Sequence, residues 1–271
     1  MNNLISFWLA PVTALFHPRV YRDAAKSSGG RGVLYALYLS LIAVVLVMIL
    51  LAARVAPVTD DLAGWLQKNM PVVIWTPQGI VLENGQTAVT LRHPQYGPIA
   101  KLDLTKKVVT EADFGDGFLF VTATRVYIKR GPGQIEDRDI TQAGMQTGQR
   151  LPPRIRITGD ITGQLYKNIK HTLGVVIPLI LFFIIFLSIL LANVFYSLVG
   201  LLLNLGRKQK LGYGAVFTLT CFATTVSFTL SWLRFVLPVA PASWPVVVNI
   251  LISLAYIVFA FKLTDREAEA K

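Results

Sequence analysis

Residues 172–205, TLGVVIPLILFFIIFLSILLANVFYSLVGLLLNL, decide the fold of this 271-residue chain. Residues 173–203 include no charged side chain, and a helix needs only about 20 apolar residues to cross a hydrocarbon core of about 30 Å. A helix of this length without a polar face would have no surface to turn toward water in a soluble protein. The stretch therefore predicts a spanning helix at residues 172–203, long enough to tilt or to leave the core near residues 193–200.

Three further apolar segments have the length of a spanning helix: residues 33–53, 213–237 and 244–262. The chain is 54% hydrophobic and only 15% charged, whereas soluble domains average about 25% charged residues. A cleaved signal peptide is the alternative for residues 33–53, because small residues (Ala52, Ala53 and Ala56) stand near its end. Signal peptides have a shorter apolar core, of about 7–15 residues, so an uncleaved anchor is favoured. The predicted fold class is an α-helical integral membrane protein with four transmembrane helices.

Residues 1–32 predict a short amphipathic helix that does not span. Apolar residues recur there at helical spacing, at Leu4, Ile5, Trp8, Val12, Leu15 and Phe16. Basic residues follow them, so we expect the segment to lie in the cytoplasmic interface of the membrane. The alternative is packing against the neighbouring helices, which would use the same apolar stripe.

Residues 54–170 change in composition and period, and predict a small β-rich domain inserted between the first and second spans. Segments rich in β-branched and aromatic residues end at turn signals such as Asn84-Gly85 and predict strands at residues 72–74, 87–92, 99–104, 118–122 and 125–129. Residues 60–69 predict a short helix, and residues 136–139 an exposed, self-neutralising loop. A segment of roughly 115 residues is enough for one modest core.

The positions of the basic residues predict the topology. Lys and Arg precede the first span, fill the loop at residues 204–212 and recur in the tail at residues 263–271, whereas residues 238–245 have none. The positive-inside rule then places both termini and the basic loop in the cytoplasm, and residues 54–170 outside. Because topology accounts for the net charge of +11, we predict no nucleic-acid partner.

No residue pattern in the sequence predicts an enzyme. Walker loops and the His-Glu-x-x-His and Gly-x-Ser-x-Gly sequences are absent. The topology places His17 on the opposite side of the membrane from His93 and His171, which excludes a site made by all three. We therefore predict no catalytic residue, no metal and no cofactor.

The acidic cluster of Glu111, Asp113 and Asp116 is a weak match to a calcium loop. A glycine stands where such a loop needs a ligand, so a solvated turn is favoured. The single cysteine, Cys221, lies in an apolar segment and excludes an intramolecular disulfide.

Two polar features belong to the third and fourth spans. One face of the third span carries hydroxyl groups at helical spacing, at Thr220, Thr224, Ser227 and Ser231. Such a stripe lines a polar path in some proteins, but hydrogen bonding to helix carbonyls or to a neighbouring helix is favoured here. Arg234 and Asn249 have similar depths on antiparallel spans, so we expect an inter-helix hydrogen bond between them.

A set of basic residues gathers at the predicted cytoplasmic face: Arg19, Arg22, Lys26, Arg31, Arg207, Lys208 and Lys210. Such a set can bind anionic lipid headgroups. The general excess of Lys and Arg in the cytoplasmic segments of membrane proteins produces the same clustering, and it is the favoured alternative.

The whole layout resembles a bacterial membrane family catalogued as domain of unknown function 1189. The resemblance rests on the order of the segments and on Pro71-Val72-Val73-Ile74, residues 99–105, Phe120-Val121-Thr122 and Tyr213 at the start of the third span. It implies a bacterial inner-membrane protein with a periplasmic domain. Some members are labelled maltodextrin-utilisation proteins, which implies a link to sugar uptake.

These observations lead to one functional expectation and two alternatives. We expect a non-enzymatic accessory or scaffold protein that is surrounded by membrane lipids and whose external domain, residues 54–170, binds a protein partner. The first alternative is a component of a transport or lipid-handling system in which the third span lines a polar path. A membrane enzyme is the second.

Overall fold

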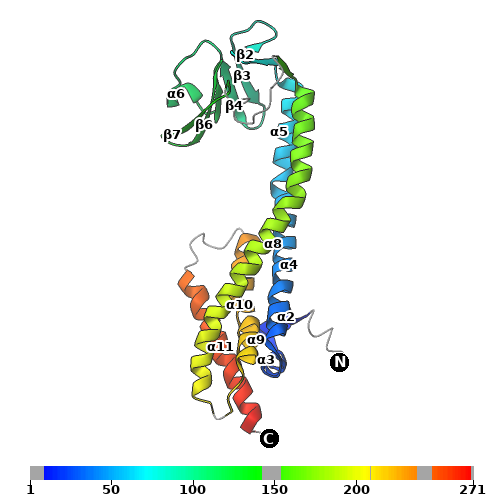
Figure 1. The fold of residues 1–271 in the computed structure, drawn as a ribbon, viewed down its shortest axis with the longest axis vertical. Coiled ribbons are helices and arrows are strands. Elements are labelled where there is room, and N and C mark those ends of the chain that lie inside the picture. The colour runs from blue at the N-terminus through cyan, green and yellow to red at the C-terminus, as the bar shows by residue number, and fades with distance from the viewer. Residues whose placement is uncertain (1–8, 142–153, 208, 237–245, 270–271) are drawn as a thin grey trace. The chain divides into compact units, whose positions relative to one another are not determined.

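The computed structural model describes residues 9–141, 154–207, 209–236 and 246–269, without the side chains of residues 15–16, 233–236, 246 and 266–269. The chain divides into two compact units (Figure 1). Unit 1 comprises Met1–Ala52 and Val175–Lys271, and unit 2 comprises Ala53–Gly174. Each unit is described by itself.

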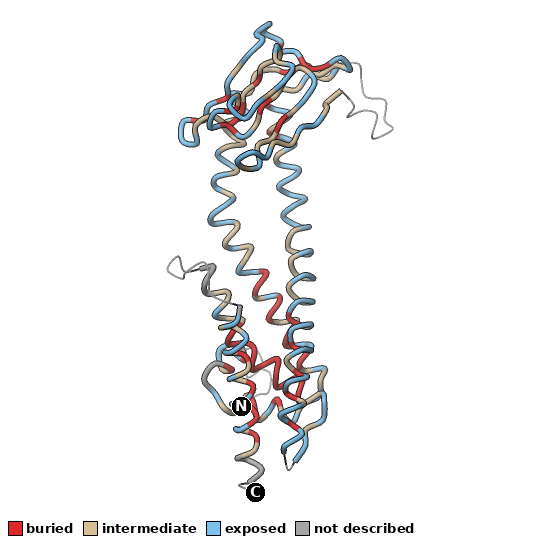
Figure 2. Tube along the Cα trace, turned by 90° about the vertical axis from the view of Figure 1, so that its left-hand side faces the viewer, coloured by how far each residue is buried: buried red, intermediate tan, exposed pale blue. Residues whose placement is uncertain are grey.

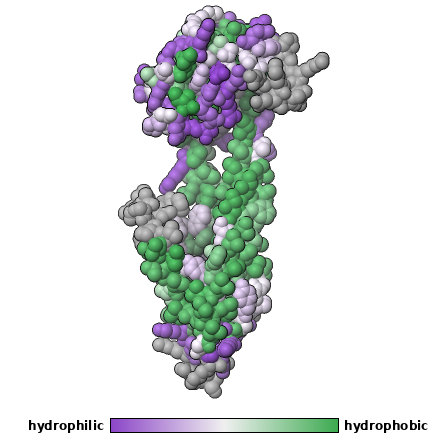
Figure 3. Space-filling view, turned by 60° about the vertical axis from the view of Figure 1, so that its left-hand side comes forward, coloured by the Kyte–Doolittle hydropathy of each residue, from purple (hydrophilic) through white to green (hydrophobic). Residues whose placement is uncertain are grey.

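Unit 1 is helical, and the described chain contains four helical segments that are long and apolar enough to span a membrane. They are Gly29–Arg54, Gly159–Leu205, Tyr213–Trp232 and Val247–Asp265. Hydrophobic residues cover these helices in Figure 3, whereas the strands of unit 2 carry mostly hydrophilic ones. The prediction of four apolar helices, with a β-rich segment between the first and the second, is confirmed.

Two short helices precede the first span. Each has a proline among its first two residues, and proline fits the first turn because its missing N–H would have no partner there. They are α2 (Ala10–Phe16) and α3 (Pro18–Ala25). Tyr21 and Ala24 are buried against the other helices of unit 1, and the Tyr21 hydroxyl donates to the Ala14 carbonyl at 2.6 Å. This is the packing alternative, and contact with the membrane interface stays a prediction.

The third span lies at the centre of unit 1. In its most apolar 18-residue window 67% of the residues are buried, against 6% in the corresponding window of the long helix α8 (Gly159–Leu205). The Tyr35 ring of α4 (Gly29–Arg54) stacks on Phe222 at 4.0 Å between ring centroids, and the Tyr35 hydroxyl lies 2.8 Å from that of Thr225. Buried residues (red in Figure 2) gather where these helices cross.

The third span is two helices instead of the single one predicted. α9 (Tyr213–Ala223) ends at Ala223, Thr224 caps it, and α10 (Thr225–Val236) begins at the next residue. The Thr225 hydroxyl donates to the Cys221 carbonyl at 3.2 Å, and the Thr224 hydroxyl oxygen lies 3.1 Å from the Thr220 carbonyl oxygen. Such side-chain bonds compete with the backbone ladder and bend helices.

Two helices extend beyond their predicted spans. α8 begins 13 residues before Thr172, where the predicted second span starts, and it continues through Pro178 without ending. α11 (Val246–Glu269) continues into the charged tail predicted at residues 263–271. Hydropathy identifies the part of a helix that is suited to lipid, but it does not show where the backbone hydrogen bonding ends. Both helices therefore extend beyond their apolar residues.

Unit 2 contains two sheets. In the smaller one β1 (Val73–Thr76) lies between β2 (Gly79–Leu82) and β8 (Ile155–Ile157). The larger has the order β3-β4-β5-β6-β7, with strands Ala88–His93, Gly97–Asp103, Leu119–Val121, Arg125–Gly131 and Gln134–Asp139. Only the β4–β5 pair is parallel among these strands.

One apolar core joins the two sheets to a helix. Alternate residues of the strands, such as Val73, Ile80 and Leu102, are buried together, and Trp65 of α5 (Ala56–Asn69) packs against them. The period of two places these apolar side chains on one face of each sheet. α5 contains the short helix predicted at residues 60–69 and is longer than predicted.

Two sequence interpretations in unit 2 were wrong. Residues 136–139, expected as a loop, belong to the edge strand β7, although their charges do pair, as Glu136 with Arg138 at 2.8 Å. The acidic cluster expected as a turn begins with a short helix, α6 (Glu111–Phe114), which Thr110 caps. Both segments are polar, so hydrophobic periodicity gave no sign of regular structure.

Candidate functional site

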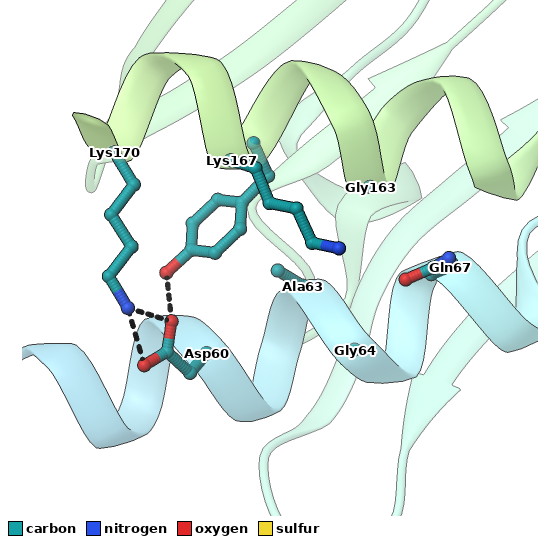
Figure 4. Close-up of a pocket in the computed structure, with 8 residues that line it drawn as sticks. Asp60, Ala63, Gly64, Gln67, Gly163, Lys167 and Lys170 are labelled. Atoms are coloured by element: carbon teal, nitrogen blue, oxygen red, sulfur yellow. Dashed lines mark hydrogen bonds and ion pairs between the residues drawn. The ribbon is translucent and has the colours of Figure 1, made fainter. Parts of the chain in front are cut away.

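The candidate site lies within unit 2, between α5 and the first turns of α8. At one end, Asp60 of α5 accepts hydrogen bonds from Lys170 at 2.6 and 2.7 Å and from the Tyr166 hydroxyl at 2.7 Å (Figure 4). The Tyr166 oxygen also lies 3.1 Å from the Thr59 hydroxyl oxygen. Tyr166 and Lys170 are four residues apart on α8, and therefore point to one side.

At the other end of the site the two helices approach closely because α8 carries glycines there. A Cβ atom at Gly159 would collide with the Gln67 carbonyl, and one at Gly163 would lie 2.8 Å from the Gln67 side chain. The Gln67 amide donates to Asp160 at 3.3 Å. A Gly-x-x-x-Gly spacing places both glycines on one helix face, where backbones can come near each other.

A cavity of about 260 Å³ lies between these two ends. It is lined by Asp60, Ala63, Gly64, Gln67, Gly163, Tyr166, Lys167 and Lys170. Lys167 extends from α8 along the space between the helices (Figure 4). Among the described residues, no carboxylate lies within ion-pairing distance of the Lys167 ammonium.

The electrostatics of the cavity favour an anion. The Lys170 ammonium, and after it the Tyr166 hydroxyl, holds the pKa of the Asp60 carboxyl below its usual value. Asp60 is therefore ionised at neutral pH and is matched by Lys170. Lys167 remains as one positive charge without a counterion on the cavity wall, an arrangement suited to binding a small anionic group.

His93 at the end of β3 is a second polar centre of unit 2. Its ring is buried, and Nδ1 accepts hydrogen bonds from the backbone N–H groups of Gln95 and Tyr96 at 3.1 and 3.4 Å. Its Nε2 lies 3.4 Å from Asp61, and the Trp65 ring contacts it edge-on. Asp61 and Trp65 belong to α5, so His93 links this helix to the end of β3. No sequence motif marks His93.

The predicted hydroxyl stripe of the third span takes part in helix packing. Thr224 donates to the Asn193 side-chain oxygen of α8 at 2.9 Å, and Ser227 lies 2.6 Å from Ser253 of α11. Thr220 and Ser231 donate to carbonyls of their own helices. The favoured interpretation of these four residues agrees with this geometry. Sequence analysis did not predict the partners Asn193 and Ser253.

The predicted pair of Arg234 and Asn249 is only partly visible. The Arg234 side chain lies outside the described residues, and the Asn249 amide oxygen is buried without a hydrogen-bond partner among those described. The hydrogen bond between them stays a prediction.

The basic residues predicted to contact lipid differ in their exposure and in their contacts. The Arg207 side chain is only 6% exposed, donates to Asp265 at 2.7 Å and lies over the Phe261 ring at 5.3 Å. Lys208 lies outside the described residues. Arg22 and Arg31 are half-buried, whereas the remaining members are exposed, namely Arg19, Lys26 and Lys210. Contact of this set with lipid stays a prediction.

The acidic residues near α6 have structural roles. Asp113 accepts from the Thr110 backbone N–H at 2.9 Å and pairs with Lys106, and these bonds lower the pKa of the Asp113 carboxyl to about 2. Glu111 pairs with Lys129 at 3.1 Å. Across the described part of the chain, no three His, Cys, Asp or Glu side chains are grouped to hold a metal ion.

Four helices that are long and apolar enough to cross a membrane, with a β-rich insert after the first of them, are the layout expected of a multi-pass membrane protein. The chain belongs to the family described as "Protein of unknown function (DUF1189)", whose family model matches residues 11–261. The comparisons with curated proteins and with solved structures gave no match.

Proposed function

We propose that this protein is a non-enzymatic accessory or scaffold protein of a bacterial inner membrane, whose unit 2 lies on the extracytoplasmic side and binds a protein partner. The distribution of Lys and Arg supports this orientation. The N-terminal segment, the loop at residues 204–212 and the tail at residues 263–271 are basic, as cytoplasmic segments usually are. Domains as long as unit 2 cross the membrane largely regardless of their own charge.

The observation that carries the proposal is an apolar stripe on the unit 2 part of α8. Ile161, Leu165 and Ile169 are 46%, 56% and 45% exposed. They follow one another at intervals of four residues and so share a helix face. Exposed apolar side chains at this spacing are the anchors with which one helix binds in a groove of another protein.

Lipid covers at most the lower end of this stripe. Leu173 begins the uncharged run of α8, and Leu165 and Ile161 precede it by eight and twelve residues, about 12 and 18 Å along a helix. The headgroup layer on each side of a bilayer is only about 5–8 Å thick. If Leu173 marks the edge of the hydrocarbon core, Leu165 and Ile161 stand beyond the lipid, where a protein partner would shield them from water.

The test places a photoreactive amino acid at Leu165 in native membranes, with the same replacement at Val108 as the matched control. Val108 is also apolar and is 75% exposed in unit 2, but it lies off the stripe. We expect one discrete protein adduct at Leu165 and none at Val108, with mass spectrometry identifying the partner. Adducts with lipid alone, or identical adducts at both positions, would contradict the proposal.

A further inference from the structure

We infer that the cavity between α5 and α8 binds the phosphate of an anionic phospholipid headgroup from the outer leaflet. The inference rests on the orientation given under the proposed function. It concerns a different surface from the apolar stripe, and a ligand instead of a protein partner.

Within the part of the chain that the structure describes, the charged groups of the cavity leave one positive charge unpaired. Two cations and one carboxylate line the cavity, and the Asp60 carboxylate is already bonded to Lys170. One positive charge, on Lys167, is left to match the single negative charge of a phosphodiester. Gln67 of α5 and Tyr166 of α8 line the cavity from its two sides and offer a polar and an apolar surface to the rest of a headgroup.

The cavity also has room for a ligand larger than a water molecule. The cavity of about 260 Å³ is large against the roughly 30 Å³ that one water occupies in the liquid. Gly64 is on its wall, and a Cβ atom built there would meet no other atom within 4 Å. The volume is therefore open at Gly64, and a larger side chain at that position would enter it without displacing the backbone.

The two lysines of the cavity lie close along α8 to the start of its uncharged run. Lys170 and Lys167 precede Leu173 by three and six residues, about 4.5 and 9 Å along the helix. This range overlaps the headgroup layer of about 5–8 Å. Long basic side chains reach along the helix toward lipid phosphates, and tyrosine is enriched at the same depth. The Lys170 end of the cavity is thus at headgroup depth, and Lys167 stands just beyond the outer edge of that layer.

The experiment uses the full-length protein, reconstituted in vesicles of phosphatidylcholine and phosphatidylglycerol and then extracted in mild detergent. Native mass spectrometry counts the lipid molecules retained by each variant. Lys167→Gln removes the charge and Gly64→Leu fills the cavity. The matched controls are Lys107→Gln, at an exposed lysine elsewhere in unit 2, and Gly174→Leu, at a helical glycine of α8 with open space around it.

We expect the wild type and both controls to retain phosphatidylglycerol. Lys167→Gln should retain about tenfold less, as follows from the loss of one charge-assisted bond. Gly64→Leu should also retain less, because its side chain occupies the cavity. Inorganic phosphate should not displace the lipid. Equal retention by all variants, equal retention of phosphatidylcholine, or displacement by inorganic phosphate would overturn the inference.

The readout is independent of the proposed function. The purified protein has no partner present, and the photocrosslink at Leu165 can be measured separately in Lys167→Gln membranes. Loss of lipid with an intact crosslink supports the inference alone, whereas lipid retained by Lys167→Gln refutes it whatever the crosslink shows. Gly64→Leu should melt no lower than the wild type, because leucine favours a helix more than glycine does.

Discussion

Glycine at position 32 sets how closely α4 lies against α9. A Cβ atom there would stand 2.9 Å from the Phe217 ring and 3.0 Å from the Thr218 Cα atom. The ring can rotate, but the Thr218 backbone can move only with α9, which is the most buried part of the unit. Small residues at such crossings let helix backbones approach in membranes.

We expect Gly32→Ala to lower the stability of unit 1 by about 1–3 kcal/mol, the usual effect of overpacking. Thermal denaturation of the purified protein measures it. Gly174→Ala is the matched control, since a Cβ atom there meets nothing within 4 Å. If Gly32→Ala melted as high as Gly174→Ala, the close approach of α4 and α9 described here would be wrong.

At the scale of single residues, sequence analysis selected the right polar side chains more often than their partners. The spacing of Thr224 and Ser227 on one helix predicted a shared face, and both are buried in contacts. Spacing along one helix carries no information on which residue of another helix faces it. The partner Asn193 was therefore missed, although an asparagine within an apolar run is itself a signal of a buried hydrogen bond.

Among the elements, the contact between α8 and the bend of the third span makes a distinct prediction. The Asn193 amide donates to the Ile189 carbonyl of its own helix at 2.9 Å and accepts from Thr224. A double-mutant cycle of Asn193→Leu and Thr224→Val should give a coupling free energy of roughly 0.5–2 kcal/mol, the range of inter-helix bonds in membranes.

The measurement is the unfolding free energy of the two single variants, the double variant and the wild type in the same detergent. Strictly additive effects of the two substitutions would contradict a hydrogen bond between Asn193 and Thr224.

Thr224→Val also separates the two functional hypotheses, the scaffold protein and the transport component. If Thr224 only packs, the Thr224→Val protein should form the same crosslink at Leu165 at temperatures where it is folded. If the third span lines a transport path, Thr224→Val should lose transport activity while the protein stays folded.

Strands were predicted where their two faces differ in polarity. The predicted segments at residues 87–92 and 99–104 correspond to β3 and β4. In β3 buried and exposed residues alternate toward its end, and in β4 the apolar residues Ile99, Ala100 and Leu102 are buried. β7 was missed because Gln134–Asp139 holds four charged residues and one isoleucine. Charged side chains are common on such edge strands, since they discourage pairing with another chain.

At the scale of the whole molecule, hydropathy predicted the order of the four apolar helices and of the insert, because each apolar run is a local property of the chain. The cavity was not predictable in this way. Asp60 and Lys170 are 110 residues apart in the sequence, and only the folding of unit 2 brings them together. Neither residue belongs to a motif, so no local signal marks the pair.

The claim on which the account most depends is that unit 2 lies outside a four-span anchor. Single cysteines at Lys107 and Lys210, in a Cys221→Ala background, test it with a membrane-impermeant maleimide applied to spheroplasts. Cys221 is the one native thiol and is only 1% exposed, so its removal leaves a clean background. We predict labelling at position 107 in intact spheroplasts and at position 210 only after lysis. Labelling at position 210 with protection at position 107 would contradict the account.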